Sequence, residues 1–249
     1  MKKATAGWVC AALDAEYGTL TWRSHGEPLE VLMQTILSQA TSDINSGRAF
    51  DSLRRAFPGG WDDVRCAQVG EIADAIRGGG LADAKAPRLR AVLQAIYEGT
   101  GKTDLEFLKT MPTDEAKAFL SSFPGVGPKT TACVLMFSLG RPVLPVDTHV
   151  FRVSHRLGLI EARLGEAKAH AALQNQLTDA EVYPYHVHLI RHGRRVCVAQ
   201  QPRCEMCVLA ARCAYRQQGG KLSSKLPPQN SPETLHGLKE NAGVGSNKS

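Results

Sequence analysis

The stretch FPGVGPKTTACVLMFSLGRPVLPVDTHVFR, residues 123–152, combines a Gly-Pro turn, a helical pattern and an extended return that ends at an aspartate. A helix over about 129–139 is about 16 Å long at about 1.5 Å per residue. The return over 140–146 spans up to about 23 Å when extended, and its prolines favour extended backbone. The chain therefore has the reach to bring Asp147 back beside Lys129.

The Pro-Gly-Val-Gly-Pro turn has two interpretations. Gly125 and Gly127 can adopt positive φ and let another backbone approach closely. The amides of Gly125, Val126 and Gly127, at the start of the helix that carries Lys129, would then bind a phosphate oxygen whatever the nucleotide sequence. The alternative is an ordinary tight turn between two helices, with a solvated lysine. Asp147 is expected to cap the helix that follows it, which does not exclude a catalytic role.

Length and composition indicate a globular protein. At 249 residues, with 43% hydrophobic and 22% charged residues, the chain makes one large domain or two ordinary ones. No apolar run approaches the roughly 20 residues needed to span a bilayer. The N-terminal segment is broken by Asp14 and Glu16, so we interpret it as a helix and not as a signal peptide. We therefore expect a cytoplasmic protein with no membrane partner.

Positive charge is concentrated near the C-terminal end. The chain has 30 Lys and Arg against 24 Asp and Glu, and its net charge of +6 favours a polyanionic partner without proving one. A basic protein that is merely soluble is the alternative. Six arginines and a single acid, Glu205, lie between Arg191 and Arg216, while the rest of the chain is close to balanced. This region is a candidate for contact with a phosphate backbone.

Helical periodicity dominates the chain. Apolar residues follow the i, i+3, i+4, i+7 pattern over 29–37 and, behind Pro87, over 89–97. The strand-like stretch at 143–146 contains a proline. The chain is therefore predicted to be all-α, with a disordered tail over 216–249 that has few residues able to form a core. Weaker helical patterns cover about 44–56, 69–77, 114–122, 130–139, 148–157, 166–177 and 185–196.

Four of the seven cysteines form a cluster with the spacing Cys197-x6-Cys204-x2-Cys207-x5-Cys213. Four thiolates on a compact loop suit a tetrahedral metal ion or an iron–sulfur cube, because both need convergent soft ligands. Disulfides are the alternative, but the other cysteines lie scattered among apolar neighbours, and the lack of a secretory signal favours a reducing compartment. Zinc sites more often pair two Cys-x2-Cys knuckles, so the spacing modestly favours a [4Fe-4S] cluster over zinc.

These motifs occur in an order that resembles the endonuclease III family of DNA glycosylases: PGVGPK, then VDTH with its aspartate 18 residues after the lysine, then HGRRVC with the cysteine spacing. The resemblance runs over roughly residues 8–215. It implies an all-α fold of two lobes with a cleft between them. One lobe is a six-helix barrel domain over 24–138, with a helix-hairpin-helix near 114–138. The other combines 1–23 with 139–215 and holds a [4Fe-4S] cluster.

By this resemblance Lys129 matches the catalytic lysine of the family and Asp147 its catalytic aspartate. A neutral lysine amine can attack C1′ of a damaged nucleotide, displace the base and leave an imine, after which the 3′ phosphate leaves by β-elimination. The aspartate would stabilise positive charge that develops on the sugar. The resemblance thus implies a monomeric bifunctional glycosylase and AP lyase that removes oxidised pyrimidines from duplex DNA. It also implies a place at the nucleoid of a prokaryote. Two alternatives stay open: a monofunctional, adenine-removing glycosylase of the superfamily, and a non-catalytic iron–sulfur protein that binds DNA.

The resemblance also places side chains that would contact DNA. Extruding a base costs a few kcal/mol and leaves a gap in the stack. Gln39, or its neighbour Ala40, lies where the family has a polar wedge, and Leu81 matches its apolar wedge. The alternatives are a polar residue at a helix end and a buried loop leucine. Between the first two cysteines of the cluster the basic residue is Arg203, so we expect Arg194 to assist phosphate contact there.

Overall fold

The computed structural model describes residues 2–220, apart from the side chains of 162, 166 and 167. These residues form helices joined by turns and contain no β-strand, which confirms the all-α prediction. None of the helices in this range is long and apolar enough to cross a bilayer. The α-helices are α1 (Ala6–Tyr17), α2 (Pro28–Ser38), α3 (Asp43–Ala56), α4 (Trp61–Cys66), α5 (Val69–Ile76), α6 (Ala82–Thr100), α7 (Thr113–Ser121), α8 (Pro128–Cys133), α9 (Thr148–Leu157), α10 (Gly165–Gln174), α11 (Asp179–Arg195) and α12 (Ala214–Gln217).

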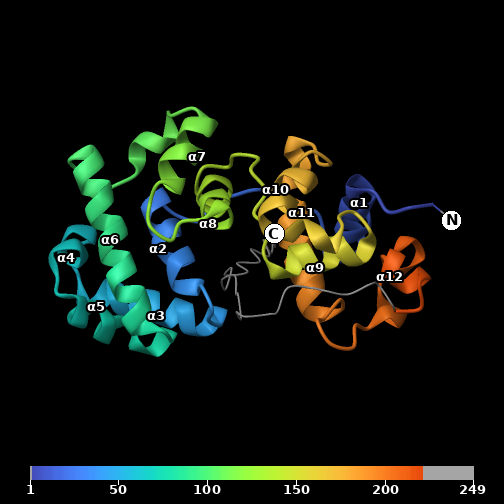
Figure 1. Cartoon of the computed structure of the whole chain (residues 1–249), viewed down its shortest axis with the longest axis horizontal. Helices are drawn as coiled ribbons and strands as arrows, with labels where there is room; N and C mark the ends of the chain where they lie inside the picture. The colour runs from blue at the N-terminus through green and yellow to red at the C-terminus, as the bar shows by residue number, and fades with distance from the viewer. Residues whose placement is uncertain (1, 221–249) are drawn as a thin grey trace, which may run out of the picture.

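The helices fall into two groups that lie side by side (Figure 1). We call α2 to α8 the barrel lobe; in it α2 packs against α3, α6 and α8, and α6 also packs against α4 and α5. The second lobe joins α1, from the start of the chain, to α9 through α12, and α11 packs against both α1 and α9. We propose that these lobes are the two predicted domains, divided near residues 23 and 138.

Two helices that flank the site begin where the sequence predicts. Pro28 occupies the first position of α2, where a fixed φ and a missing N–H cost nothing, and Ile36 on the same helix is fully buried. Asp147 precedes α9, and its Oδ1 accepts the N–H of Val150 at 2.7 Å. The predicted cap is therefore confirmed, and it fixes the backbone of the aspartate at the entrance to its helix.

Two other helices begin earlier than predicted. α6 starts five residues before Pro87 instead of behind it, and α11 starts six residues before the predicted position 185. Each has a proline, Pro87 or Pro184, as its sixth residue. A proline there removes a single i to i−4 hydrogen bond. The remaining hydrogen bonds of helices with 19 and 17 residues outweigh that loss. α11 is also started by a reciprocal capping box between Thr178 and Glu181.

The segment that leads to Asp147 follows the predicted course. α8 continues into a π-helical turn, Val134–Ser138, and the two together occupy the predicted helix over 130–139. Residues 140–146 then return without forming a strand. The predicted tail over 216–249 lies outside the described residues except for its beginning. Residues 216 and 217 belong to α12, so that boundary was placed too early.

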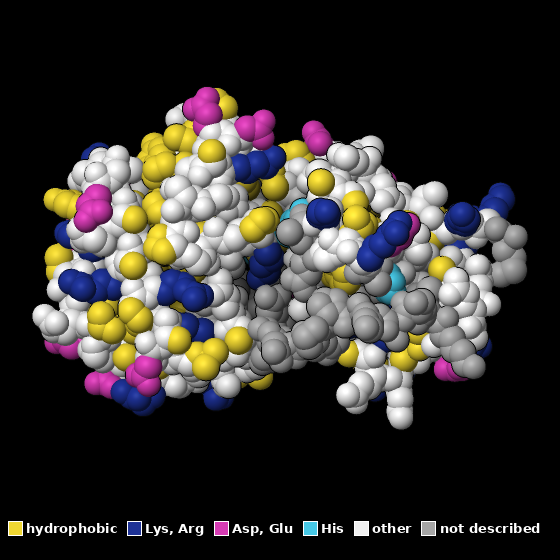
Figure 2. Space-filling model, viewed as in Figure 1, with side chains coloured by type: hydrophobic (Ala, Val, Ile, Leu, Met, Phe, Trp, Pro, Cys, Tyr) yellow, Lys and Arg dark blue, Asp and Glu magenta, His cyan; other side chains and the backbone are white. Residues whose placement is uncertain are grey.

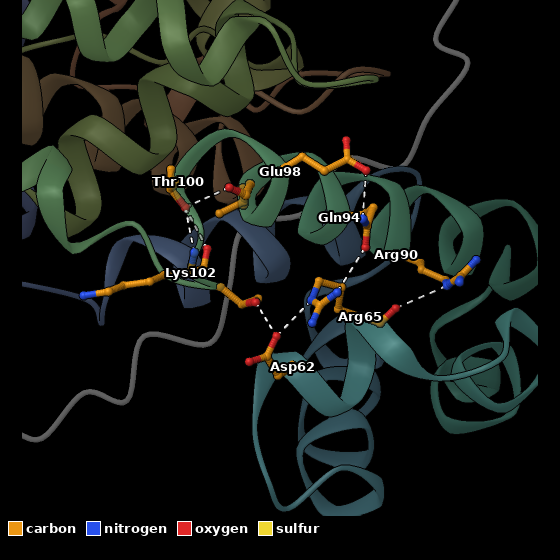
Figure 3. Close-up of polar contacts among 9 residues, drawn as sticks. Asp62, Arg65, Arg90, Gln94, Glu98, Thr100 and Lys102 are labelled. Atoms are coloured by element: carbon orange, nitrogen blue, oxygen red, sulfur yellow. Dashed lines mark hydrogen bonds and ion pairs between the residues drawn. The ribbon is translucent and has the colours of Figure 1, made fainter.

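The outer edge of the barrel lobe is held by side chains on α4 and α6 (Figure 3). The periodicity did not indicate α4. Arg65 donates from Nε to Asp62 Oδ1 at 2.9 Å and from Nη1 to Gln94 Oε1 at 3.2 Å. Its guanidinium also lies 3.9 Å from the centre of the Tyr97 ring. The positive charge of this arginine is thus balanced locally by a carboxylate and an aromatic face.

Candidate functional site

A cavity of about 530 Å³ opens between the two lobes. Figure 2 shows the hollow, with Lys or Arg and His side chains at its wall. The barrel lobe contributes the end of α2, the first turns of α6 and the hairpin before α8, and the second lobe contributes Val146 and a residue of α10. The lining residues are Gln39, Ala40, Leu81, Ala84, Lys85, Arg88, Gly125, Gly127, Pro128, Lys129, Thr130, Val146 and His170.

Lys129 and Asp147 approach this cavity from different lobes. Lys129 is in the first turn of α8 and lines the cavity. Asp147 directly follows the lining residue Val146 and is only 2% exposed. Burial raises the pKa of the Asp43 carboxyl, and the neighbouring Arg194 lowers it. Two weaker charge effects also act on this pKa: Asp147 raises it and Lys129 lowers it. Both side chains are therefore within electrostatic reach of one carboxyl group.

Histidines hold the return segment in place ahead of Asp147. His170 Nδ1 lies 3.0 Å from the carbonyl oxygen of Leu144, and His186 Nδ1 lies 2.8 Å from that of Pro145. A carbonyl oxygen only accepts, so each ring donates from Nδ1. His186 is fully buried, and burial lowers its pKa to about 4. Its neutral ring thus fixes the extended backbone that presents the aspartate.

The hairpin before α8 uses one of the two positive-φ positions that its glycines allow. Gly125 has φ +75°, which strains any other residue, and a Cβ there would lie 2.7 Å from Nε of Arg88, so that side chain would also have to move. Gly127 has φ −90° and ψ −179°, so it is extended, as the residue that caps α8. Val126 is buried, and its N–H donates to the carbonyl of Phe123 at 3.1 Å.

The two loops predicted to carry wedge residues meet at the cavity. Gln39 Oε1 accepts from Arg88 Nη1 at 2.7 Å, and its amide nitrogen lies 3.4 Å from the Thr130 hydroxyl. Leu81 is 58% exposed, which rules out the buried alternative. Ala40 and Leu81 have φ of 53° and 54°, a left-handed conformation that costs a non-glycine residue about 1 kcal/mol or more. The fold therefore maintains backbone strain in both loops.

Sequence reasoning missed three lining residues with titratable side chains: Lys85, Arg88 and His170. Lys85 is 3% exposed and donates to the carbonyl oxygens of Leu37 at 2.6 Å and Gly79 at 3.5 Å, which ties the two loops together. Burial, with a smaller effect of Arg88, lowers the pKa of Lys85 to about 8. Leu81, Lys85 and Arg88 share one helical face at i, i+4 and i+7, a spacing that was present in the sequence.

The four clustered cysteines line a second cavity, of about 20 Å³, at the far end of the second lobe. None of them forms a disulfide. Burial, with smaller contributions from the neighbouring thiols, raises the pKa of Cys207 to about 11. Within residues 2–220, no three His, Cys, Asp or Glu side chains are placed to hold one metal ion. The ligands of an iron–sulfur cube each bind a different iron, so they stand farther apart than the ligands of a single ion.

Two buried arginines lie beside these cysteines, and their charge bears on whether an iron–sulfur cube fits there. Arg152 and Arg156 are 4% and 6% exposed. Arg156 donates to Cys197 Sγ at 3.4 Å and to the carbonyls of Val198 and Ala199 at 2.6 and 2.7 Å, and Arg152 Nε donates to the carbonyl of Cys197 at 3.2 Å. No carboxylate of the described residues is within ion-pair distance of either guanidinium. Two buried positive charges beside thiols fit an anionic group held by the four sulfurs.

The arginines predicted to contact DNA have protein partners. Arg194 Nη1 lies 2.8 Å from Asp43 Oδ2, an ion pair between the end of α11 and the start of α3 that joins the lobes. Arg203 Nη1 donates to the carbonyl of Arg195 at 3.2 Å and lies at the edge of the cysteine cavity. Their phosphate contacts stay predictions.

Comparison with known proteins agrees with this geometry. A family model described as HhH-GPD superfamily base excision DNA repair protein matches residues 33–183. The chain is 39% identical over 176 residues to the "Putative DNA glycosylase At3g47830" of Arabidopsis thaliana, a match that covers 71% of this chain and 60% of that protein. It is 31% identical over 172 residues to DEMETER-like protein 2 of Arabidopsis thaliana, covering 62% of this chain but 13% of that protein. It is 32% identical over 201 residues to endonuclease III of Thermotoga maritima, covering 80% and 89% of the two chains.

Solved structures show the same arrangement of helices. A non-covalent endonuclease III–DNA complex matches with a TM-score of 0.73 at 26% identity, over 86% of this chain and 97% of that chain. A trapped covalent endonuclease III–DNA intermediate matches with a TM-score of 0.72 at 26% identity, over 88% and 100%. The fold of this chain is thus similar to folds that have been seen bound to DNA.

Proposed function

The chain belongs to the HhH-GPD superfamily of base excision DNA repair proteins, and from this premise we propose that it is a monomeric bifunctional DNA glycosylase and AP lyase acting on oxidised pyrimidines in duplex DNA. The observation that carries the proposal is the position of Lys129. It lies in the wall of a cavity between the lobes, and the buried Asp147 directly follows Val146 of the same wall. A cavity of about 530 Å³ is large enough for a single nucleotide.

Lys129 supplies the nucleophile. Its Nζ attacks C1′ of the extruded nucleotide, the bond from C1′ to the base breaks, and the electron pair leaves with the base. Loss of a proton from Nζ and opening of the sugar ring give an imine. The imine acidifies C2′–H, and loss of that proton expels the 3′ phosphate by β-elimination. The amine must be neutral at the moment of attack, and enclosure within a cavity favours the neutral form.

Asp147 supplies negative charge. As the base departs, positive charge develops on the sugar, and the carboxylate next to Val146 of the cavity wall stabilises it. The carboxylate stays in position because one oxygen caps α9 and the preceding backbone is held by His170 and His186. This arrangement keeps one oxygen engaged as a cap while the side chain still acts on the sugar.

DNA binding involves the rim of the cavity. Leu81 projects from its strained loop and enters the base stack, while Gln39, held by Arg88, lies beside the space that the base has left. The turn before α8 contacts a phosphate through the amides of Gly125 and Gly127, because that of Val126 is used inside the turn. Extrusion costs a few kcal/mol, least for damaged pairs, which favours damaged bases.

The four cysteines of the second cavity hold a [4Fe-4S] cluster. When bound, the cluster supplies negative charge and a rigid scaffold. Arg152 and Arg156 balance that charge and hold the chain between Cys197 and Cys204 through its carbonyl groups. The loop that carries Arg203 is thereby fixed in the basic region.

Borohydride reduction of the imine tests the enzymatic proposal. Wild-type protein mixed with duplex DNA containing an abasic site is expected to form a covalent adduct, and Lys129→Ala is expected to form none. Lys117→Ala, which removes an exposed lysine of α7, is the matched control and should trap like wild type. A wild-type protein that never traps would refute the lyase. An adduct that persists in Lys129→Ala and maps to Lys85 by mass spectrometry would assign the nucleophile to the other lysine of the cavity.

A further inference from the structure

One histidine of the cavity has a face that neither the proposed chemistry nor the wedge residues use. His170 lies on α10, is half-buried, and lines the same cavity as Lys129 and Val146. Its Nδ1 binds the return segment, but its other ring nitrogen has no role in holding Asp147. His170 therefore borders the space in which an extruded nucleotide would lie.

The hydrogen bond to Leu144 determines the tautomer of His170. Because the carbonyl oxygen at 3.0 Å only accepts, Nδ1 carries the proton of the neutral ring and Nε2 carries the lone pair. Burial lowers the pKa of His170, and the positive charge of Lys129 acts in the same direction against the opposing effect of the hydrogen bond. The ring is therefore neutral at physiological pH, and Nε2 is a hydrogen-bond acceptor.

The protein leaves Nε2 of His170 unused on a residue that lines the cavity. Within residues 2–220 this nitrogen makes no hydrogen bond with the protein, and it is not one of the fully buried polar atoms that lack a partner. His186 provides the contrast, since its Nε2 is both enclosed and without a partner. The charged side chains at the cavity wall belong to Lys85, Arg88 and Lys129, and all of them are hydrogen-bond donors. His170 thus adds an acceptor to a wall whose charged groups all donate.

We propose that the Nε2 lone pair of His170 accepts a hydrogen bond from an N–H group on the Watson–Crick edge of the extruded base, and so selects the bases that are released. The inference rests on the proposed function and narrows its substrate class. Suitable substrates are damaged pyrimidines that keep N3–H or an exocyclic amino group at C4. A base whose edge has lost these donors leaves Nε2 unpaired when the cavity closes around it, which costs binding energy in the transition state.

Two other roles for His170 lead to different results. If Nε2 took the proton from Lys129, base release and cleavage of abasic DNA would both depend on it, because both begin with the same amine. If the ring only held the return segment, its loss would resemble the loss of Gln174, which binds the N–H of Leu144 at 2.7 Å and the carbonyl of Pro142 at 3.0 Å from the same helix. A base-reading residue acts only while a base is present.

The test compares two duplexes that differ in the base alone: one contains 5,6-dihydrouracil, the other an abasic site at the same position. In His170→Ala, single-turnover base release is expected to fall about tenfold, the value of one neutral hydrogen bond in the transition state. Borohydride trapping on the abasic duplex should change by less than about twofold, because no base contacts the ring. Gln174→Ala loosens the return segment without touching the base, so it should lower the ratio of the two rates much less than His170→Ala does. His170→Gln, whose amide both donates and accepts, should recover part of the lost ratio.

Equal losses on both duplexes would assign His170 to activation of Lys129, and a loss of base release no larger than that of Gln174→Ala would reduce His170 to a support for the return segment. Either result overturns the inference. Thermal unfolding of each variant shows whether the helix α10 still packs, and His170→Gln decides the matter if the alanine variant does not fold. Failure of the wild-type protein to trap abasic DNA would refute the proposed lyase instead, so the two failures are distinguishable.

Discussion

The two lobes bury different kinds of polar side chain. In the barrel lobe they are hydroxyls and one lysine: Thr35, Ser38, Thr41, Ser46, Thr130, Thr131, Ser138 and Lys85. In the second lobe they are mostly ionisable: Asp147, Arg152, Ser154, His155, Arg156, His186, His188 and His192. Buried hydroxyls need only a nearby carbonyl, whereas a buried ionisable group depends on its charge state and its partners. The second lobe is therefore the part of the molecule that should respond to pH and to the group held by its cysteines.

The histidines of α11 show why ionisable groups are buried there. His188 Nε2 lies 2.8 Å from Asp14 Oδ1, and His192 Nδ1 lies 2.9 Å from the Tyr17 hydroxyl, both on α1. His186 binds the return segment instead. One helix thus connects the N-terminal helix, the cysteine cavity and the segment before Asp147 through imidazole rings. Apolar packing would hold these elements together but would not fix the position of the Asp147 carboxylate.

The largest effect is expected from Asp147→Asn. Asparagine caps a helix about as well as aspartate, so the free energy of unfolding should change by less than about 1 kcal/mol. Base release should nevertheless fall about a thousandfold, because the charge that stabilises the sugar is lost. Single-turnover release of a damaged base measures the effect, and Asp179→Asn, an exposed carboxylate in the first turn of α11, is the control. Undiminished base release in Asp147→Asn would remove the carboxylate from the mechanism.

Next in size is Arg156→Leu. The substitution leaves the carbonyls of Val198 and Ala199 without their donor and removes half of the buried positive charge beside the cysteines. We expect a loss of about 3 kcal/mol in the free energy of unfolding, together with lower iron content per chain. Urea unfolding and iron analysis measure the two effects. Arg156→Lys keeps the charge but not the forked geometry. It should therefore keep most of its iron while still losing much of the free energy of unfolding.

A pH effect on stability should follow, and it should come from His186. Its folded pKa is about 4, whereas the unfolded chain binds the proton near 6.5, so acid favours the unfolded state. The stability present above pH 6.5 is lost as the pH falls toward 4, by about 2 kcal/mol between pH 6.5 and 4.5 from this residue alone. In His186→Gln the loss over that interval should be smaller by about that amount. Equal slopes in the two proteins would contradict the buried neutral ring.

The sequence predicted the parts of the site that depend on local patterns. The turn, the helix from 148 to 157 with its cap, and the cysteine spacing each involve a short segment with its own physical signal. Position 87 was misleading, because a proline often marks the start of a helix but is tolerated as the sixth residue of a long one. The positive φ that the sequence allows in the turn occurs at Gly125, but no sequence signal indicated the left-handed conformation of Ala40 and Leu81.

The residues that were missed owe their position to tertiary packing. Lys85 and Arg88 look like solvated charges on a helix, and only the approach of the loops at 37–39 and 79 makes them part of the cavity. His170 lies in no recognisable motif. It reaches the cavity because α10 packs beside the return segment. No local pattern encodes an approach between segments that are far apart in the chain, so these roles could not be deduced from periodicity or spacing.

The smallest effect is expected from Arg65→Ala, the counterpart of Arg156 in the barrel lobe. Asp62, its ion-pair partner, is 60% exposed, and an exposed pair gains little over its hydrated charges. The contact with the Tyr97 ring and the bond to Gln94 are lost as well, so the midpoint of thermal unfolding should fall by about 3 °C or less, without loss of iron. Arg65→Ala and Arg156→Leu measured side by side separate a charge that is balanced within the protein from one that the proposed cluster would balance. If the two variants lost the same stability and the same iron, the difference in buried charge between the lobes would have no energetic meaning.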